Sequence, residues 1–131
     1  MATIFTRIIK GEIPCYKIYE DENYFAFLDI NPLQKGHTSV IPKKEDDYIF
    51  NLDDATYSGL MMTAKKIAAA IKESTNCKRV GVTVLGMEVP HVHIHLVPMN
   101  SEKDMLFSNP KMELSKEEFE AIAADIAKRV K

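Results

Sequence analysis

The chain has 131 residues, of which 46% are hydrophobic and 27% charged, and 17 basic and 19 acidic residues give a formal net charge of −2. These values fit one soluble globular domain with a single core. They offer no basic patch for nucleic acid or an anionic membrane, and there is no apolar run of about 18 residues to span a bilayer.

The N-terminus and the two cysteines both indicate a cytoplasmic protein. The first residues, MATIFTRIIKGEIP, carry charges within their apolar pattern and have no small-residue cleavage site, unlike a signal peptide. Cys15 and Cys77 lie far apart and form no C-x-x-C pair. We therefore expect reduced thiols in the cytoplasm.

A short helix is predicted at residues 3–10, and Gly11 ends it. Its apolar residues are expected to be buried: Ile4, Phe5, Ile8 and Ile9.

Three strands are predicted to follow this helix. Residues 17–21 and 24–30 are rich in aromatic and β-branched residues, and the polar break between them indicates a hairpin. Residues 31–36 have the composition of a turn, and residues 37–43 fit the next strand.

The second half begins with a helix and continues with two strands. Apolar residues recur at helical spacing over residues 53–75, and Asp53 is a plausible N-cap. Residues 79–86 and 91–98 fit strands joined by a short link. The apolar stripe of the helix consists of Leu60, Ala64, Ile67, Ala68 and Ile71.

The last predicted element is a helix over about residues 115–130, which Ser115 and Glu118 open as a capping box. Its apolar stripe consists of Phe119, Ile122, Ala123, Ile126 and Val130. Short connections between most strands favour an antiparallel sheet with helices on one side, in a single α+β domain over residues 1–131.

Three of the four histidines occupy alternate positions in the stretch HVHIHLVP: His91, His93 and His95. On a strand these side chains share one face, while the apolar residues between them point to the core. An exposed polar face, a zinc site and a nucleophilic imidazole all remain open. The nucleophile is favoured because neighbouring imidazoles can attack phosphorus, orient the attacking ring and move protons at neutral pH.

The pattern His-φ-His-φ-His-φ-φ, where φ is apolar, resembles the signature of the histidine triad (HIT) superfamily of nucleotide hydrolases and transferases. Residues 4–43 are similar to the N-terminal half of that family, and the resemblance extends to about residue 98. The segment 99–131 is not diagnostic.

The resemblance implies a five-stranded antiparallel sheet with a central amphipathic helix and a C-terminal helix, and a homodimer that shares one ten-stranded sheet. It makes His93 the nucleophile, with His91 and His95 beside it and His37 in support. Asp29 would take the ribose hydroxyls, although it could equally cap the following turn. The residues expected to surround the nucleotide are Ile4, Phe5, Ile8, Ile13, Phe27, Ile30, Met87 and Glu88, although without the resemblance plain core is the favoured interpretation of the six from Ile4 to Ile30.

The chain departs from the family pattern just before the triad. Met87 stands where a phosphate-contacting glutamine is usual, the preceding loop is short, and the chain has no tryptophan. Met87 could either leave out a phosphate contact or fill an apolar gap.

The resemblance therefore implies a cytoplasmic hydrolase that acts at the α-phosphorus of a purine nucleotide derivative, either a nucleoside phosphoramidate or a dinucleoside polyphosphate. A covalent nucleotidyl-histidine would form and release a nucleoside monophosphate, with no metal or cofactor required. The alternative is a nucleotide-binding or scaffold protein with little turnover.

Overall fold

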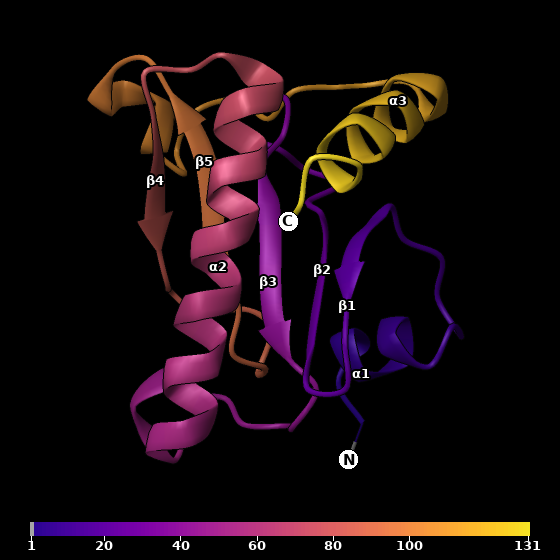
Figure 1. Cartoon of the computed structure of the whole chain (residues 1–131), viewed down its shortest axis with the longest axis vertical. Coiled ribbons are helices and arrows are strands. Elements are labelled where there is room, and N and C mark those ends of the chain that lie inside the picture. The colour runs from indigo at the N-terminus through magenta and orange to yellow at the C-terminus, as the bar shows by residue number, and fades with distance from the viewer. Residues whose placement is uncertain (1) are drawn as a thin grey trace.

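Five antiparallel strands form one sheet in the order β1-β2-β3-β5-β4 (Figure 1). The computed structural model describes residues 2–131. The elements are α1 (Ile4–Ile9), β1 (Lys17–Glu20), β2 (Tyr24–Leu28), β3 (Thr38–Pro42), η1 (Ile49–Asn51), α2 (Asp54–Thr75), β4 (Arg79–Thr83), β5 (Ile94–Met99), η2 (Glu102–Met105) and α3 (Lys116–Ala127). The predicted α+β fold is confirmed.

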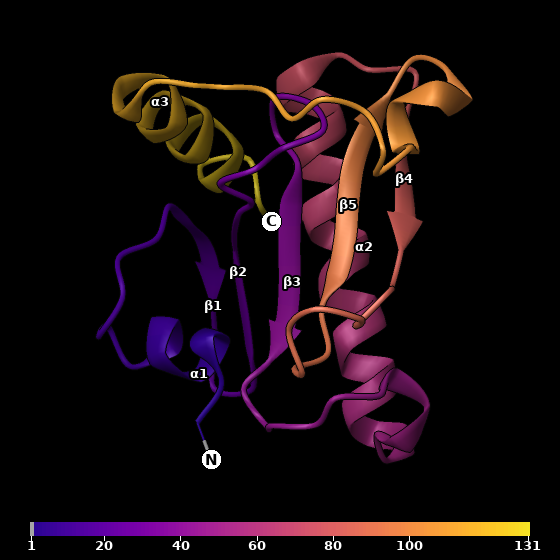
Figure 2. The same ribbon diagram turned by 180° about the vertical axis from the view of Figure 1, so that it is seen from behind.

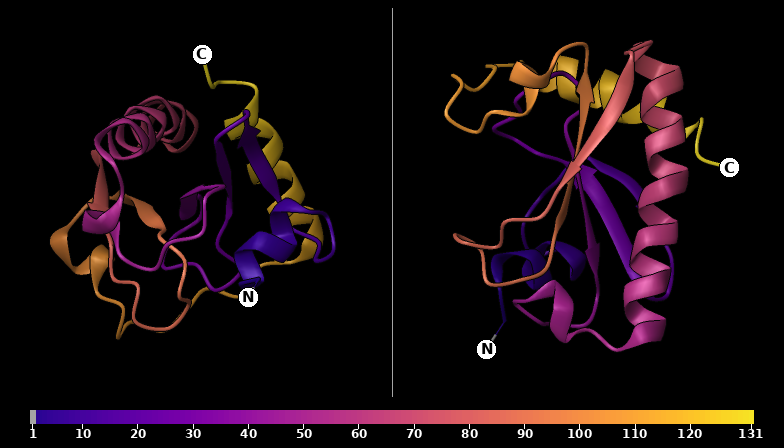
Figure 3. Two further views of the ribbon diagram at one scale, coloured as in Figure 1. Left: turned by 90° about the horizontal axis from the view of Figure 1, so that it is seen from below. Right: turned by 90° about the vertical axis from the view of Figure 1, so that its left-hand side faces the viewer.

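Helices cover both faces of the sheet rather than the one face predicted. In β2, Ala26 and Leu28 join the main core, whereas Phe25 and Phe27 pack on the opposite face with Ile8 of α1. Every residue of β2 is buried, so both of its faces need cover. Figure 3 shows α2 on one side of the sheet, with α1 and the loop before β5 on the other.

The long helix α2 forms where the apolar periodicity predicts it. The Asp53 side chain accepts a hydrogen bond from the Thr56 N–H, as an N-cap does. The helix ends at Asn76, whose φ of 56° is left-handed. Within residues 2–131, no helix is both long and apolar enough to cross a bilayer.

The capping box predicted for the last helix is present at Ser115 and Glu118. Its buried residues Phe119, Ala123 and Ile126 belong to the main core. The Phe119 ring stacks on Tyr16 at a centroid distance of 4.8 Å, which holds α3 against the sheet.

Three details of the predicted elements are wrong, and the first is that the strand predicted over residues 79–86 ends at Thr83. Ile4, expected to be buried, is 49% exposed, because α1 is only six residues long and buries Ile8 alone. The last strand begins at Ile94 rather than His91, because pairing with β3 starts at Val40 and Ile94. The preceding segment is bent and does not pair with β3; its Val92 N–H donates to the Asp46 carbonyl instead.

Candidate active site

The three alternating histidines lie where the chain enters β5. The residues between them, Val92 and Ile94, are in the main core. The histidine side chains point away from that core and are nevertheless buried, with exposed fractions of 0% for His91, 7% for His93 and 6% for His95. The rings of His93 and His95 lie 4.7 Å apart between centroids.

Two backbone carbonyls determine where His91 and His93 carry their protons. His91 Nε2 lies 2.8 Å from the Pro42 carbonyl oxygen, and His93 Nδ1 lies 2.7 Å from the His91 carbonyl oxygen. A carbonyl oxygen only accepts, so each of these ring nitrogens is the donor. A neutral His93 ring therefore keeps its lone pair on Nε2, the nitrogen free for attack.

A backbone N–H likewise determines which ring nitrogens of His37 and His95 carry their protons. The Leu33 N–H donates to His37 Nδ1 at 3.0 Å, so a neutral His37 carries its proton on Nε2. That proton points at His95 Nδ1, 3.0 Å away, which leaves His95 with its own proton on Nε2. Burial lowers the pKa of both His37 and His95 to about 4, so both rings are neutral at pH 7.

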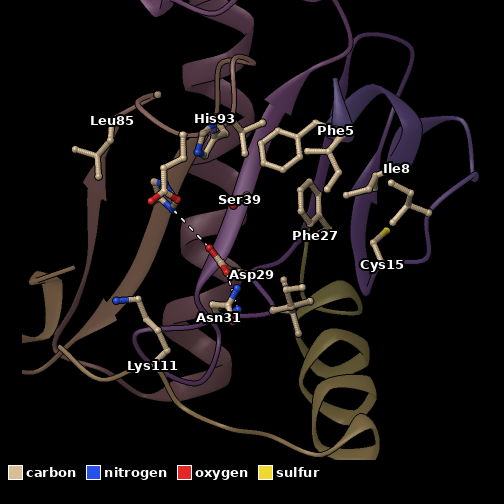
Figure 4. A pocket seen from close by; sticks show the side chains of 18 of the residues that line it. Phe5, Ile8, Cys15, Phe27, Asp29, Asn31, Ser39, Leu85, His93 and Lys111 are labelled. Carbon is tan, nitrogen blue, oxygen red and sulfur yellow. Dashed lines mark hydrogen bonds and ion pairs between the residues drawn. The ribbon is translucent and has the colours of Figure 1, made fainter. Parts of the chain in front are cut away.

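His93 and His95 line a cavity of about 470 Å³. His91 and His37 do not line it, since they are buried behind the other two rings. Every residue expected to surround a nucleotide lines this cavity: Ile4, Phe5, Ile8, Ile13, Phe27, Asp29, Ile30, Met87 and Glu88. Figure 4 shows Phe5, Ile8 and Phe27 on one side of the cavity, and the Asp29 Oδ2 atom lies 4.0 Å from His95 Nδ1.

Asp29 caps the turn after β2, one of the two roles considered for it, and also lies close to two of the histidines. Its Oδ1 accepts from the Asn31 N–H at 2.8 Å and so caps the turn after β2. Its Oδ2 lies 3.6 Å from His37 Nε2 and 4.0 Å from His95 Nδ1. Burial raises the pKa of the Asp29 carboxyl, and Asp29 is one of the residues that line the cavity.

Distances alone would allow a metal ion between Asp29, His37 and His95, whose ligand atoms all lie within 4.8 Å of one another. The hydrogen bonds argue against it. Ligation through His37 Nε2 would move the ring proton to Nδ1, where it would meet the Leu33 N–H, itself a donor. This trio therefore suits proton transfer better than metal binding.

Among the cavity-lining residues that the sequence did not single out, three lie close to the histidines or carry a charge: Ser39, Phe107 and Lys111. Ser39 pairs in register with His95, and strand alternation from His37 could have placed it there. The Phe107 ring packs 4.9 Å from His95 and 6.0 Å from His37. Neither Phe107 nor Lys111 lies in a motif, so the sequence held no signal for them.

Met87 is 88% exposed at the rim of the cavity, so the idea that it fills an apolar gap is wrong. It follows Gly86, whose φ of 68° turns the loop at this point. Figure 2 shows this loop, between β4 and β5, on the same face of the sheet as α1.

The model of the HIT domain family matches residues 10–102 of the chain. A relative in Schizosaccharomyces pombe named adenosine 5'-monophosphoramidase hnt1 is 35% identical, with all of both chains covered.

Two solved structures share the fold over almost the whole chain. A Hit-like protein of Bartonella henselae, described as involved in cell-cycle regulation, has a TM-score of 0.82 at 30% identity and covers 97% of this chain and 95% of its own. A zinc-bound histidine triad family protein of Mycobacterium smegmatis has a TM-score of 0.80 at 28% identity, and the match covers 98% of this chain and 95% of that protein's chain.

Proposed function

The chain belongs to the HIT domain family, and from this membership we propose that it is a nucleotide hydrolase that releases a nucleoside monophosphate. One observation carries the proposal. The backbone groups around the triad give His93 a free Nε2 lone pair and His95 an Nε2 proton, and both rings line the same cavity. A nucleophile and a proton donor side by side suit displacement at phosphorus.

In the first step, His93 Nε2 attacks the α-phosphorus, and the bond from phosphorus to the leaving group breaks. A phosphorus–nitrogen bond forms, giving a nucleotidyl-histidine, while His95 Nε2–H hydrogen-bonds the leaving group and passes its proton to it. In the second step, water attacks the same phosphorus and gives a proton back to His95 Nε2, the phosphorus–nitrogen bond breaks to release the nucleoside monophosphate, and His93 returns to its starting form.

His37 and His91 act behind these two rings. Because His37 donates to His95 Nδ1, it supplies the hydrogen bond that directs the His95 proton to Nε2. The His91 carbonyl accepts the Nδ1 proton of His93, which raises the electron density of the ring and aims Nε2. Neither ring lines the cavity, so both serve by orienting their partners.

The cavity walls and the relative named a monophosphoramidase support our proposal for the substrate class. Phe5, Ile8 and Phe27 offer apolar surface for a purine base, and the Asp29 carboxylate suits a pair of ribose hydroxyls. A nucleoside phosphoramidate is the first candidate and a dinucleoside polyphosphate the second. We also place the protein in the cytoplasm, in keeping with its two free cysteines, and expect a homodimer from the family resemblance alone.

A nucleotide-binding or scaffold protein with little turnover is the second candidate. The observation that favours it is Met87, whose thioether cannot donate a hydrogen bond to phosphate from the rim of the cavity.

The decisive test is release of AMP from an adenosine phosphoramidate, with intact-mass measurement of a covalent adduct early in the reaction. The His93→Ala variant should lose both the adduct and turnover by several orders of magnitude while still binding AMP. A thermal melt checks that the variant is folded. Near-normal turnover in His93→Ala would refute the nucleophile, and AMP binding without release in the wild type would favour the scaffold.

A further inference from the structure

We propose that Thr3, Thr6 and Glu45 form a positioning network that fixes the His91 ring and, through it, the nucleophile His93. The effect of this network on turnover rests on the function proposed above, whereas its effect on the His91 ring does not. None of the three residues lines the cavity, so they would act without touching the substrate.

The network joins three segments that are distant in sequence. The Thr3 hydroxyl lies 2.8 Å from His91 Nδ1, although the two residues are 88 positions apart. Thr3 also caps α1, since its hydroxyl oxygen accepts from the Thr6 N–H at 3.0 Å. The Glu45 carboxylate, just after β3, accepts from the Thr3 N–H at 3.0 Å and from the Thr6 hydroxyl.

The direction of the central hydrogen bond follows from its surroundings. Because His91 Nε2 donates to the Pro42 carbonyl, the neutral ring has its lone pair on Nδ1. The Thr3 hydroxyl is therefore the donor to Nδ1. Burial lowers the pKa of His91, which favours this neutral form.

Both nitrogens of His91 are thus held by the protein, and the side chain is fully buried. No polar atom of the ring is left for a substrate. The same residue presents its backbone carbonyl to His93 Nδ1 at 2.7 Å. Because both nitrogens of the His91 ring are hydrogen-bonded, the His91 backbone carbonyl that orients His93 is also kept in place.

The network also ties the triad to the wall of the cavity. The Thr3 cap begins α1, and α1 carries Phe5, whose ring lies 5.8 Å from His91 and 5.0 Å from His93. Glu45 holds the start of α1 against the chain after β3, and hydrogen bonds from Thr6 and Thr3 lower the pKa of its carboxyl. The start of α1 and the histidine ring are thereby fixed together.

The test compares Thr3→Val, which removes the hydroxyl at nearly constant shape, with Thr3→Ser, which keeps it. The first readout is the ¹⁵N spectrum of histidine-labelled protein. In the wild type, the His91 Nδ1 signal should be that of a hydrogen-bonded acceptor, with a protonated Nε2. Thr3→Val should shift the Nδ1 signal, Glu45→Ala should shift it less, and Thr3→Ser should restore it.

The second readout separates kcat from KM on an adenosine phosphoramidate. Thr3→Val should lower kcat by about tenfold, the effect of losing one hydrogen bond of ordinary strength, with KM nearly unchanged. Thr3→Ser should recover most of the rate. Asp53→Ala is the matched control, because it removes the N-cap of α2 at a comparable cost in stability but does not belong to the network.

An unchanged His91 signal in Thr3→Val would overturn the network. An equal loss of kcat in Asp53→Ala would also overturn it, because the effect would then be one of general stability. If the wild type releases no AMP, the proposed function fails, while the spectrum still decides whether Thr3 fixes His91.

Discussion

The Nε2 atom of His37 lies 3.0 Å from the Nδ1 atom of His95, and the Leu33 N–H decides which of the two donates. Both rings are buried, so a proton added to either would place a charge in a poorly solvated site beside another imidazole. The pair is thereby kept neutral. The hydrogen bonds run in one direction, from the Leu33 N–H to His37 and from His37 to His95, which lines the cavity.

The neutral pair predicts how stability depends on pH. In the unfolded chain His37 and His95 bind protons near their ordinary pKa of 6.5, whereas in the folded protein they do so only near pH 4. Between these values the unfolded state holds more protons, so the free energy of unfolding falls as the pH falls. The raised pKa of Asp29 acts in the opposite direction. Acids with lowered pKa, such as Asp125 at about 2, contribute below this window.

Urea unfolding at several values between pH 6.5 and 4 measures this slope. The His37→Asn variant removes one of the two groups, so its slope should be smaller by up to about 1.4 kcal/mol per pH unit. Equal slopes in wild type and variant would show that His37 does not resist protonation in the folded state.

A second prediction concerns metal ions. AMP release should survive treatment with EDTA, because the Leu33 N–H holds His37 in the form that cannot ligate through Nε2. Zinc binding is the alternative to be tested, because a similar protein of known structure is described as zinc-bound. Elemental analysis of the purified protein is the measurement, and stoichiometric zinc that is lost together with activity would contradict the prediction.

The sequence predicts those features that depend on local periodicity or local caps. The period of α2 and its Asp53 cap are readable within one helix, and the β1–β2 hairpin follows from composition around its turn. The start of β5 was missed because it depends on pairing with β3, which is distant in the chain. The second covered face of the sheet was missed for a similar reason, since α1 packs on β2 only after folding.

At the candidate site, the motif identified the histidines but not their protonation. Which nitrogen of His93 or His37 carries a proton depends on the His91 carbonyl and the Leu33 N–H, whose directions are set by the folded backbone. The contact between Thr3 and His91 spans most of the chain and has no local signature.

A third prediction concerns Lys111. Among the residues that the structure describes, it is the one lysine or arginine that lines the cavity, and its ammonium donates to the Asn109 and Phe107 carbonyls. We expect this charge to favour an anionic leaving group. Lys111→Met should therefore lower kcat/KM for adenosine 5'-phosphosulfate by about fivefold, an effect of about 1 kcal/mol for an exposed charge, and should change little for a phosphoramidate, whose leaving group is neutral.

Lys116→Met, on α3 and away from the cavity, is the matched control for the loss of one positive charge. The prediction fails if Lys111→Met lowers turnover of both substrates equally, or if the control shows the same discrimination.

The last prediction concerns Met87. A glutamine amide can donate a hydrogen bond to a phosphate oxygen, whereas the thioether of Met87 cannot. Because Met87 is 88% exposed at the cavity rim, Met87→Gln buries no unsatisfied amide and should leave the melting temperature unchanged. A hydrogen bond to a charged group contributes about 1.5 kcal/mol at the lower end, so kcat on a phosphoramidate should rise by about tenfold, with AMP affinity little changed. Leu85→Gln is the control, since it adds the same amide to a neighbouring rim residue that is 50% exposed. If turnover in Met87→Gln is unchanged or slower, or if Leu85→Gln gains as much, position 87 makes no contact with the reacting phosphate.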